Sequence, residues 1–338
     1  MADLTTTWLG LTLQNPLVVA ASPLSQDEDA LALAIEAGAG AVVMHSLFEE
    51  QIVAEQMAAH QFFDAHVDHD AEARSFLPET DVFALGTEPY LRQLQSLRAR
   101  FDVPIVASLN GATPGGWTDY ARQLENAGAS AIELNLYDVA TDPMRSGADV
   151  EAAQLVIAAA VVKQVAIPVC VKLSPFYASL PAFVRALGAV GVRGVTLFNR
   201  FYQPDIDLQN LDVDRHLSLS TAAELPLRLH ALAILHPHAE LDLACTGGVH
   251  SGEDAAKALL AGARVVQVAS ALLANGPGHL GVISEQLNRW LDQTGYQSSA
   301  EACGVMSLSS APDPHRWERL NYLQLLEGWQ PRVSMRKR

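Results

Sequence analysis

The sequence predicts one TIM-type (β/α)8 barrel, and three observations lead to this prediction. Short apolar runs alternate with helical segments eight times along the chain, which is the pattern of a parallel β/α fold. A helix-ending glycine turns directly into an apolar run at residues 37–42, 127–132 and 261–266. Residues 241–273 read as strand, Gly-Gly turn, helix and strand, as in the phosphate-binding part of β/α barrels. An open doubly wound sheet is disfavoured because no G-x-G-x-x-G follows the first strand.

In chain order, the first expected element is a hairpin at residues 8–13 that turns at Gly10 and could floor the barrel. The eight expected strands are short and apolar and end in small or polar residues; they are 17–22, 41–46, 103–110, 131–136, 167–172, 192–199, 241–245 and 265–268. Helical spacing predicts the helices between them at 27–37, 91–101, 115–127, 148–165, 180–187 and 221–235, with a further helix between Ser251 and Gly262.

We expect one domain over residues 1–338, in which the barrel takes up about residues 15–295. An insertion follows the second strand, from residue 47 to about residue 89. Its His60, His66 and His69 stand among aspartates and are interpreted as part of a solvated loop, so no metal site is expected. A C-terminal helical extension covers residues 296–338, and 317–326 is predicted to form a helix that caps the barrel or meets another subunit.

The composition bounds the class of protein and its partners. The 338 residues are 49% hydrophobic, which suffices for one large domain. The formal net charge of −16 argues against nucleic acid and membrane surfaces as partners, and an anionic ligand then needs a local cationic or N–H-rich site. The three cysteines form no C-x-x-C, so no disulfide framework, zinc site or iron–sulfur site is expected. Without a secretory signal or a long apolar run, the sequence favours a soluble cytoplasmic protein.

The carboxyl ends of the expected strands carry the residues that point to chemistry, because these ends face one mouth of a β/α barrel. They are Ala20, Ala21, Ser22, His45, Ser46, Asn110, Asn135, Lys172, Asn199, Gly247, Gly248, Ala269 and Ser270. Three amides and one lysine at the ends of four apolar strands suit a flat heteroaromatic ring with several donors and acceptors. The glycine pair lets an anion approach main-chain N–H groups, although an ordinary βαβ unit with packing glycines would look similar.

Together these motifs resemble the dihydroorotate dehydrogenases, FMN enzymes on a β/α barrel that oxidise a CH–CH bond in pyrimidine biosynthesis. The resemblance covers roughly residues 9–295 and is carried by Asn15-Pro16, 20–22, 133–136, 172–175, Asn199, 246–248 and 269–272. The stretches 45–51, 199–208 and 312–314 are most similar to a bacterial subgroup usually called dihydroorotate dehydrogenase-like proteins.

The resemblance implies FMN as cofactor and hydride transfer from substrate to flavin N5, while a base takes a proton from the neighbouring carbon. The residues that it assigns lie along the flavin (Ala20, Ala21, Ser22), at the flavin ring (Asn110, Asn135, Lys172, Asn199) or at the phosphate (Gly247, Gly248, Ala269, Ser270). His45, followed by Ser46, stands where the soluble enzymes have a flavin-contacting lysine. Asn135 and Asn199 would also bind the substrate.

Residues on the substrate side depart from the family pattern. Where the family has a Cys or Ser base shortly after Asn135, this sequence has Asp138, and Tyr137 is the alternative acid or base. An aspartate is a weak base unless burial raises its pKa above the usual value of about 3.9. The family's next substrate-binding asparagine is Ala140 here, and the loop that grips orotate is replaced around residues 78–86. The flavin half of the site therefore matches better than the substrate half.

These matches predict oxidation of dihydroorotate to orotate with a soluble acceptor such as fumarate. Reduction of another cyclic amide or enone is the alternative within the enzyme class. The alternative outside it is a flavin-binding relative that has lost catalysis and works through a partner protein. The sequence has no dinucleotide fingerprint or iron–sulfur cysteine cluster for passing electrons to NAD, and no membrane-docking helix that would favour quinone. The family also implies a homodimer.

Overall fold

The computed structural model describes residues 1–50, 87–111, 117–200, 205–214 and 218–328. Within these residues, eight parallel strands close into a barrel in the order β11-β12-β3-β4-β5-β6-β7-β8. The strands are β3 (Leu17–Val19), β4 (Ala41–Phe48), β5 (Ile105–Asn110), β6 (Ala131–Asn135), β7 (Val169–Leu173), β8 (Gly194–Leu197), β11 (Asp242–Thr246) and β12 (Val265–Val268). The predicted (β/α)8 barrel is therefore confirmed. The barrel closes where β12 pairs with β3.

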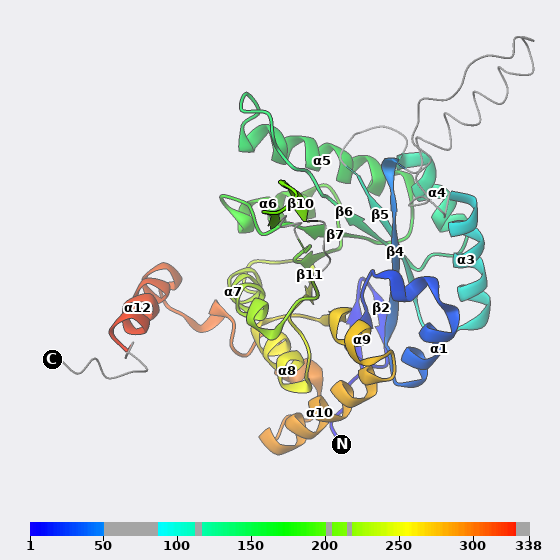
Figure 1. The fold of residues 1–338 in the computed structure, drawn as a ribbon. Helices are drawn as coiled ribbons and strands as arrows, with labels where there is room; N and C mark the ends of the chain where they lie inside the picture. The colour runs from blue at the N-terminus through cyan, green and yellow to red at the C-terminus, as the bar shows by residue number, and fades with distance from the viewer. Residues whose placement is uncertain (51–86, 112–116, 201–204, 215–217, 329–338) are drawn as a thin grey trace, which may run out of the picture.

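Helices surround the barrel, as Figure 1 shows. They are α1 (Glu28–Glu36), α3 (Thr87–Arg100), α4 (Trp117–Asn126), α5 (Gly147–Gln164), α6 (Leu180–Ala189), α7 (Leu225–Leu235), α8 (Gly252–Ala261) and α10 (His279–Thr294), with the short α9 (Ser270–Asn275) and α11 (Ser299–Ala302). No helix among the described residues is both long enough and apolar enough to cross a membrane.

Local capping explains where several helices begin and end. The Asp27 side chain accepts the backbone N–H groups of Asp29 and Ala30 at the start of α1. The Ser251 hydroxyl accepts the N–H of Asp254 at the start of α8, and Gly262 ends this helix with a φ of 118°. Gly262 thus turns the chain directly into β12, as the sequence repeat predicts.

The apolar core has one layer between the barrel and its helices and a second layer inside the barrel. The inner layer includes Val43, Val106 and Val265 from the strands. It is closed from below by the antiparallel hairpin of β1 (Thr6–Trp8) and β2 (Leu11–Leu13), whose Trp8 is completely buried against these strands. The predicted hairpin is present, and it fills the amino-terminal end of the barrel.

A second hairpin, β9 (Asp205–Asp207) with β10 (Asp212–Asp214), follows β8 and was not predicted from the sequence. Each of its strands has one apolar residue between two aspartates, so the segment has no extended apolar pattern. Its apolar residues Ile206 and Val213 are exposed. The hairpin therefore forms without the buried face that makes a strand visible in sequence.

The C-terminal extension divides into a packed part and a part that stands away from the barrel. Residues 299–306 pack on the barrel domain, with the N–H of Ser299 bonded to Asp3 O and that of Met306 to Leu260 O. The last described helix, α12 (Pro314–Glu327), has no buried residue and protrudes beside α7 in Figure 1, where Glu318 Oε2 lies 2.9 Å from His230 Nε2 of α7. The expectation that a helix here caps the barrel is wrong, because α12 covers no apolar surface of it. The other expectation, contact with another subunit, stays a prediction.

The insertion that was expected from residue 47 to about residue 89 falls mainly outside the described residues. The same holds for His60, His66 and His69, and for the loop at residues 78–86 that stands where the family grips orotate. Among the residues that the structure describes, no cluster of histidine, cysteine and acidic side chains is arranged to hold a metal ion.

We predict that Trp8→Ala lowers the free energy of unfolding by about 3–5 kcal/mol, because it empties the closed end of the barrel. Urea unfolding followed by circular dichroism measures the change. Leu33→Ala on α1 is the control, since this leucine is 54% exposed and its loss should cost no more than about 0.5 kcal/mol. Equal effects of the two substitutions would contradict the role of Trp8 as a core residue.

Candidate active site

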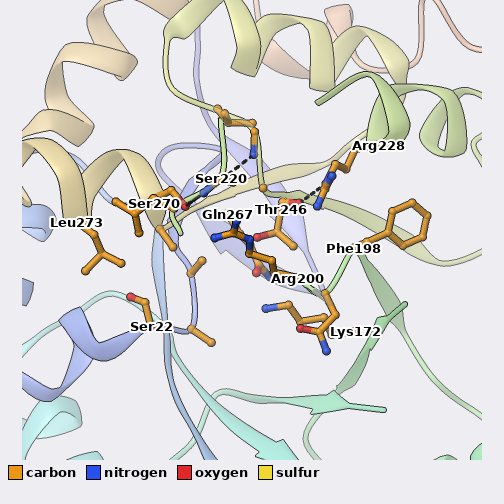
Figure 2. Close-up of a pocket in the computed structure, with 18 of the residues that line it drawn as sticks. Ser22, Lys172, Phe198, Arg200, Ser220, Arg228, Thr246, Gln267, Ser270 and Leu273 are labelled. Carbon is orange, nitrogen blue, oxygen red and sulfur yellow. Dashed lines mark hydrogen bonds between the residues drawn. The ribbon is translucent and has the colours of Figure 1, made fainter. Parts of the chain in front are cut away.

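A cavity lies at the carboxyl ends of the barrel strands (Figure 2). Its wall contains most of the residues that the sequence predicted for cofactor binding: Ala20, Ala21, Ser22, Lys172, Asn199, Gly247, Gly248, Ala269 and Ser270. Residues of five different strand ends are therefore brought to one space, as a parallel barrel requires.

One side of the cavity is formed by the glycine turn after β11. Gly247 and Gly248 have φ values of 89° and 79°, a backbone region that favours glycine. A Cβ atom on Gly248 would lie 2.6 Å from the backbone nitrogen of Leu225, so only glycine fits beneath α7. The two glycines thus let the turn pack closely under α7 while they line the cavity.

Two serines connect this turn to the end of β12. The Ser270 hydroxyl accepts hydrogen bonds from the backbone N–H of Ser220 at 3.0 Å and from its hydroxyl at 2.8 Å. The N–H of Gly248 in turn lies 3.3 Å from Ser220 Oγ. The loop before α7 is therefore fixed against both strand ends, and both serines line the cavity (Figure 2).

A buried arginine lies behind the glycine turn. Arg228 of α7 is only 5% exposed and is one of the residues that line the cavity. Its Nε donates to Thr246 O at 2.9 Å and its Nη1 to Glu224 O at 2.8 Å. Burial lowers the pKa of Arg228 from its ordinary value, and the nearby Glu224 carboxylate opposes that shift. Arginine stays charged under such shifts, so the cavity contains a fixed positive charge here.

A polar network inside the barrel supports the opposite side of the cavity. The Glu133 carboxylate is completely buried and accepts hydrogen bonds from Gln267 Nε2 at 2.7 Å and Thr196 Oγ1 at 3.0 Å. Lys172 Nζ lies 3.4 Å from its other oxygen. The network joins β6, β7, β8 and β12 and fixes the Lys172 ammonium group at the cavity wall.

The amides predicted from the strand ends also meet. Asn199 Nδ2 donates to Asn135 Oδ1, and strand register sets Asn110, Asn135 and Lys172 side by side across β5, β6 and β7. Two wall atoms, Ser22 Oγ and Gln267 Oε1, are buried without a hydrogen-bond partner among the described residues. Buried polar atoms are normally paired, so these two are suited to receive a ligand.

His45, Ser46, Asn110 and Asn135 are not among the described residues of the cavity wall. The His45 ring approaches Ser25 Oγ at 3.3 Å and packs edge-on against Tyr90, while the Ser46 hydroxyl bonds to Ser108 Oγ at 2.8 Å. Their predicted contact with a cofactor therefore stays a prediction.

The two candidate bases lie in the segment after β6. Asp138 Oδ2 forms an ion pair with Arg145 Nη2 at 2.8 Å. Asp138 lines a small separate cavity with Gly111 and Gln154, rather than the wall that contains Lys172 and Gly248. The backbone N–H of Tyr137 bonds to Asn135 O. The roles of both side chains in catalysis stay predictions.

None of the cysteines offers a reactive thiolate. Burial, together with the Glu133 charge, raises the pKa of Cys170, and burial raises that of Cys245 to about 12. Burial also raises the pKa of Cys303, whose thiol lies 3.4 Å from Ala263 O. The chain therefore does not replace the family's cysteine base with another cysteine.

Polar residues of the site that were not assigned from the sequence include Glu133, Arg200, Ser220, Arg228 and Gln267. Glu133 and Gln267 were visible as polar residues inside otherwise apolar strands, which is itself a signal of a buried network. Arg228 lies in the leucine-rich segment 225–235, where a charged residue usually indicates the solvated side of a helix. Only the packed structure turns it toward the cavity.

The closed barrel and the cavity at the carboxyl ends of its strands define a β/α-barrel enzyme with its ligand site at that mouth. A family model described as dihydroorotate dehydrogenase matches residues 3–291. The chain belongs to the dihydroorotate dehydrogenase family, and it is an oxidoreductase of that kind.

Three relatives illustrate the range of the similarity. A protein of Aeropyrum pernix, provisionally named dihydroorotate dehydrogenase A (fumarate), is 35% identical over 210 residues, which are 60% of this chain and 67% of that protein. The dihydroorotate dehydrogenase B (NAD(+)) catalytic subunit of Desulforudis audaxviator is 27% identical over 304 residues, 88% of this chain and 95% of that one. The NAD-dependent dihydropyrimidine dehydrogenase subunit PreA of Escherichia coli K12 is 24% identical over 329 residues, which are 92% of this chain and 78% of that protein.

Protonation of His45 should make the folded state sensitive to acid. Burial lowers the pKa of His45 from 6.5 to about 4. As the pH falls through 6.5 the unfolded chain binds a proton at this position, whereas the folded protein does so only near pH 4, so protonation favours unfolding in this window. We predict that His45→Asn loses less stability than the wild type between pH 6.5 and pH 4.

Urea unfolding at a series of pH values measures this difference. His238→Asn, at an exposed position, is the matched control and should keep the wild-type dependence on pH. A wild-type pH dependence in His45→Asn would contradict the prediction.

Proposed function

We propose that this protein is an FMN-dependent oxidoreductase that oxidises dihydroorotate to orotate. The observation that carries the proposal is the cavity in which a glycine cradle and a buried arginine lie on one side and Lys172 on the other. A ligand that is anionic at one end and heteroaromatic at the other suits this arrangement. Family membership supports the same cofactor, because the enzymes of the family are flavoproteins.

The residues of the cavity fit FMN on three observations. Gly247 and Gly248 line the cavity without side chains, so a phosphate can approach their backbone. Lys172 is 7% exposed and offers a cation for an electron-rich ring atom. Ser22 Oγ and Gln267 Oε1 are buried and without a partner among the described residues. When bound, FMN supplies the hydride acceptor for oxidation of the CH–CH bond.

Each end of the cofactor would then have its own set of residues. Gly247, Gly248, Ala269 and Ser270 would bind the phosphate, and Asn110, Asn135 and Lys172 the ring. Ala20 and Ala21 have small side chains that leave space along the ring, with Ser22 at their end. Asn135 and Asn199, which are hydrogen-bonded to each other, would orient the substrate amides.

We propose Asp138 as the base that removes the substrate proton, with Tyr137 as the alternative. Its place shortly after Asn135, where the family has a Cys or Ser base, supports this role. The ion pair with Arg145 opposes it, because a paired carboxylate is a weaker base. Because Asp138 lines the neighbouring small cavity, its carboxylate must turn from Arg145 toward the substrate for the proton transfer.

Reduction of another cyclic amide is the second candidate function. Ala140 stands where the family has a substrate-binding asparagine, so the chain has lost one contact to orotate. The similarity to a dihydropyrimidine dehydrogenase subunit extends over 92% of this chain, and the activity in that subunit's name concerns a related cyclic amide. The reverse reaction, oxidation of dihydrouracil, can be followed in the same way as oxidation of dihydroorotate, so dihydrouracil is the compound to compare.

We propose fumarate, or another soluble acceptor, as the oxidant that completes the cycle, and pyrimidine biosynthesis in the cytoplasm as the setting. The relative with 35% identity supports fumarate, because its name includes this acceptor. Other relatives are named as NAD(+) enzymes, and they are called catalytic subunits. Reoxidation by fumarate in the absence of any other protein distinguishes the two acceptors.

We predict that dihydroorotate, added without oxygen, bleaches the flavin absorbance of the purified yellow protein. Asp138→Asn should slow bleaching by about 10²–10⁴-fold, the usual contribution of a general base, while Tyr137→Phe should slow it less than about tenfold. Asp142→Asn is the matched control, since Asp142 is an exposed aspartate of the same segment. Stopped-flow absorbance measures the rates.

The outcomes separate the candidates. Bleaching by dihydrouracil but not by dihydroorotate would replace the first function by the second. A yellow protein that neither compound bleaches would favour the alternative of a flavin-binding relative that lacks this activity. A colourless protein that does not bind added FMN would contradict the proposal.

We also propose a homodimer that uses α12. Trp317, Leu320 and Leu323 are 51%, 45% and 51% exposed on this helix, and an isolated helix of such length is only marginally stable in water. Burial against a second copy would remove that apolar surface from water.

We predict that replacing Trp317, Leu320 and Leu323 together by glutamate converts the dimer into a monomer, as measured by light scattering. The barrel should stay folded, because α12 has no buried residue. Val282→Glu, at a residue 44% exposed on α10, is the control and should stay dimeric. A wild-type protein that is monomeric at all concentrations would contradict the proposal.

A further inference from the structure

Arg228 is a buried cation in an acidic protein. The formal net charge of the chain is −16, yet this guanidinium group is only 5% exposed. A charge in such a place is costly unless something compensates it. Thr246 O and Glu224 O accept two of its N–H groups, and these are neutral carbonyl oxygens. They satisfy hydrogen bonds but do not neutralise the charge.

The third nitrogen, Nη2, is the part of Arg228 that has no hydrogen bond among the described residues. It lies 2.9 Å from the position that a Cβ atom of Gly247 would take, so it packs directly on the glycine turn. Its nearest acid is Glu224, whose Oε2 is 3.8 Å away, which is too long for a hydrogen bond. This nitrogen is therefore available to a ligand of the cavity.

Glu224 is shared between two arginines without being hydrogen-bonded to either. Its Oε1 lies 3.9 Å from Arg200 Nη2, and its side chain is 34% exposed. Arg200 also lines the cavity. Among the described residues, two cations thus face one carboxylate, in a chain that is negatively charged as a whole.

The chemistry of this cluster favours a dianion. A guanidinium group donates parallel N–H groups that match the oxygens of a phosphate, and such charge-assisted bonds are about twice as strong as neutral ones. A neutral hydroxyl group at the same place gains little from a buried positive charge. The backbone turn at Gly247–Gly248 cannot make this distinction by charge alone.

We propose that Arg228 is the residue that makes this cavity select the phosphorylated flavin, FMN, over riboflavin, and that Glu224 weakens the selection by competing for the same guanidinium group. The inference rests on the proposed function, because it takes a flavin as the ligand. It adds a residue outside the strand ends, on α7, to the recognition of the cofactor.

The test measures the affinity of flavin-free protein for FMN and for riboflavin, by quenching of flavin fluorescence. Arg228→Met should weaken FMN binding about 100-fold, as expected for loss of one partner of a buried charge pair, and riboflavin binding less than about threefold. Arg228→Lys keeps the charge without the planar group, so its affinity for FMN should lie between those of the wild type and Arg228→Met. Arg185→Met removes the same charge from an exposed site on α6 and should change neither affinity.

A second variant tests the opposite direction and does not disturb the buried arginine. Glu224→Gln removes the competing charge, while a glutamine still accepts the N–H of Thr221 that Glu224 Oε1 accepts at 3.3 Å. FMN binding should become about three- to tenfold tighter, and riboflavin binding should stay the same. Should Arg228→Met fail to fold, this variant and Arg228→Lys decide the question.

The outcomes distinguish this inference from the proposed function. Equal losses of FMN and riboflavin affinity in Arg228→Met, or weaker FMN binding in Glu224→Gln, would overturn the inference while the flavin site stands. Wild-type protein that binds neither flavin would overturn the proposed function, and this inference with it.

Discussion

The buried carboxylate of Glu133 is the interaction on which the rest of the site depends. It lies inside the barrel on β6 and is bonded to Thr196 of β8 and Gln267 of β12, with Lys172 of β7 beside it. A buried charge that loses its partners costs several kcal/mol, so these four strands are held in one register. That register also sets Lys172 at the cavity wall. The same strand register therefore pairs the buried Glu133 carboxylate and places the Lys172 ammonium group at the cavity.

The cavity combines this fixed interior with a mouth made of small residues. Ala20, Ala21, Gly247 and Gly248 leave space at the strand ends, and the polar groups stand at the two sides of that space. Lys172 and Arg228 are both more than nine-tenths buried, so their charges act through protein rather than through water. An acidic chain can hold an anionic ligand in this way without a basic surface.

Much of the barrel and the cavity wall could be predicted from the sequence, for a physical reason. Buried parallel strands are short apolar runs bounded by glycine, and the last residue of each run faces the mouth, which is how Lys172 and Gly247 were found. The β9–β10 hairpin could not, because Ile206 and Val213 are exposed. The place of Arg228 in the cavity wall could not be predicted either, because the direction of its side chain depends on how α7 packs on β11. Asp138 lies in a loop where no period fixes orientation, and its contact with Arg145 decides where it points.

Closure of the barrel through β12 and β3 has a consequence for synthesis on the ribosome. Val266 of β12 pairs with Leu17 of β3, so a strand that is synthesised early can complete its pairing only after one of the last strands has been synthesised. Until then both have free edges, which are templates for pairing with other chains. Contacts so distant in sequence also slow folding, and transiently exposed edges promote aggregation. A nascent chain of this protein therefore cannot close its barrel before β12 has left the ribosome.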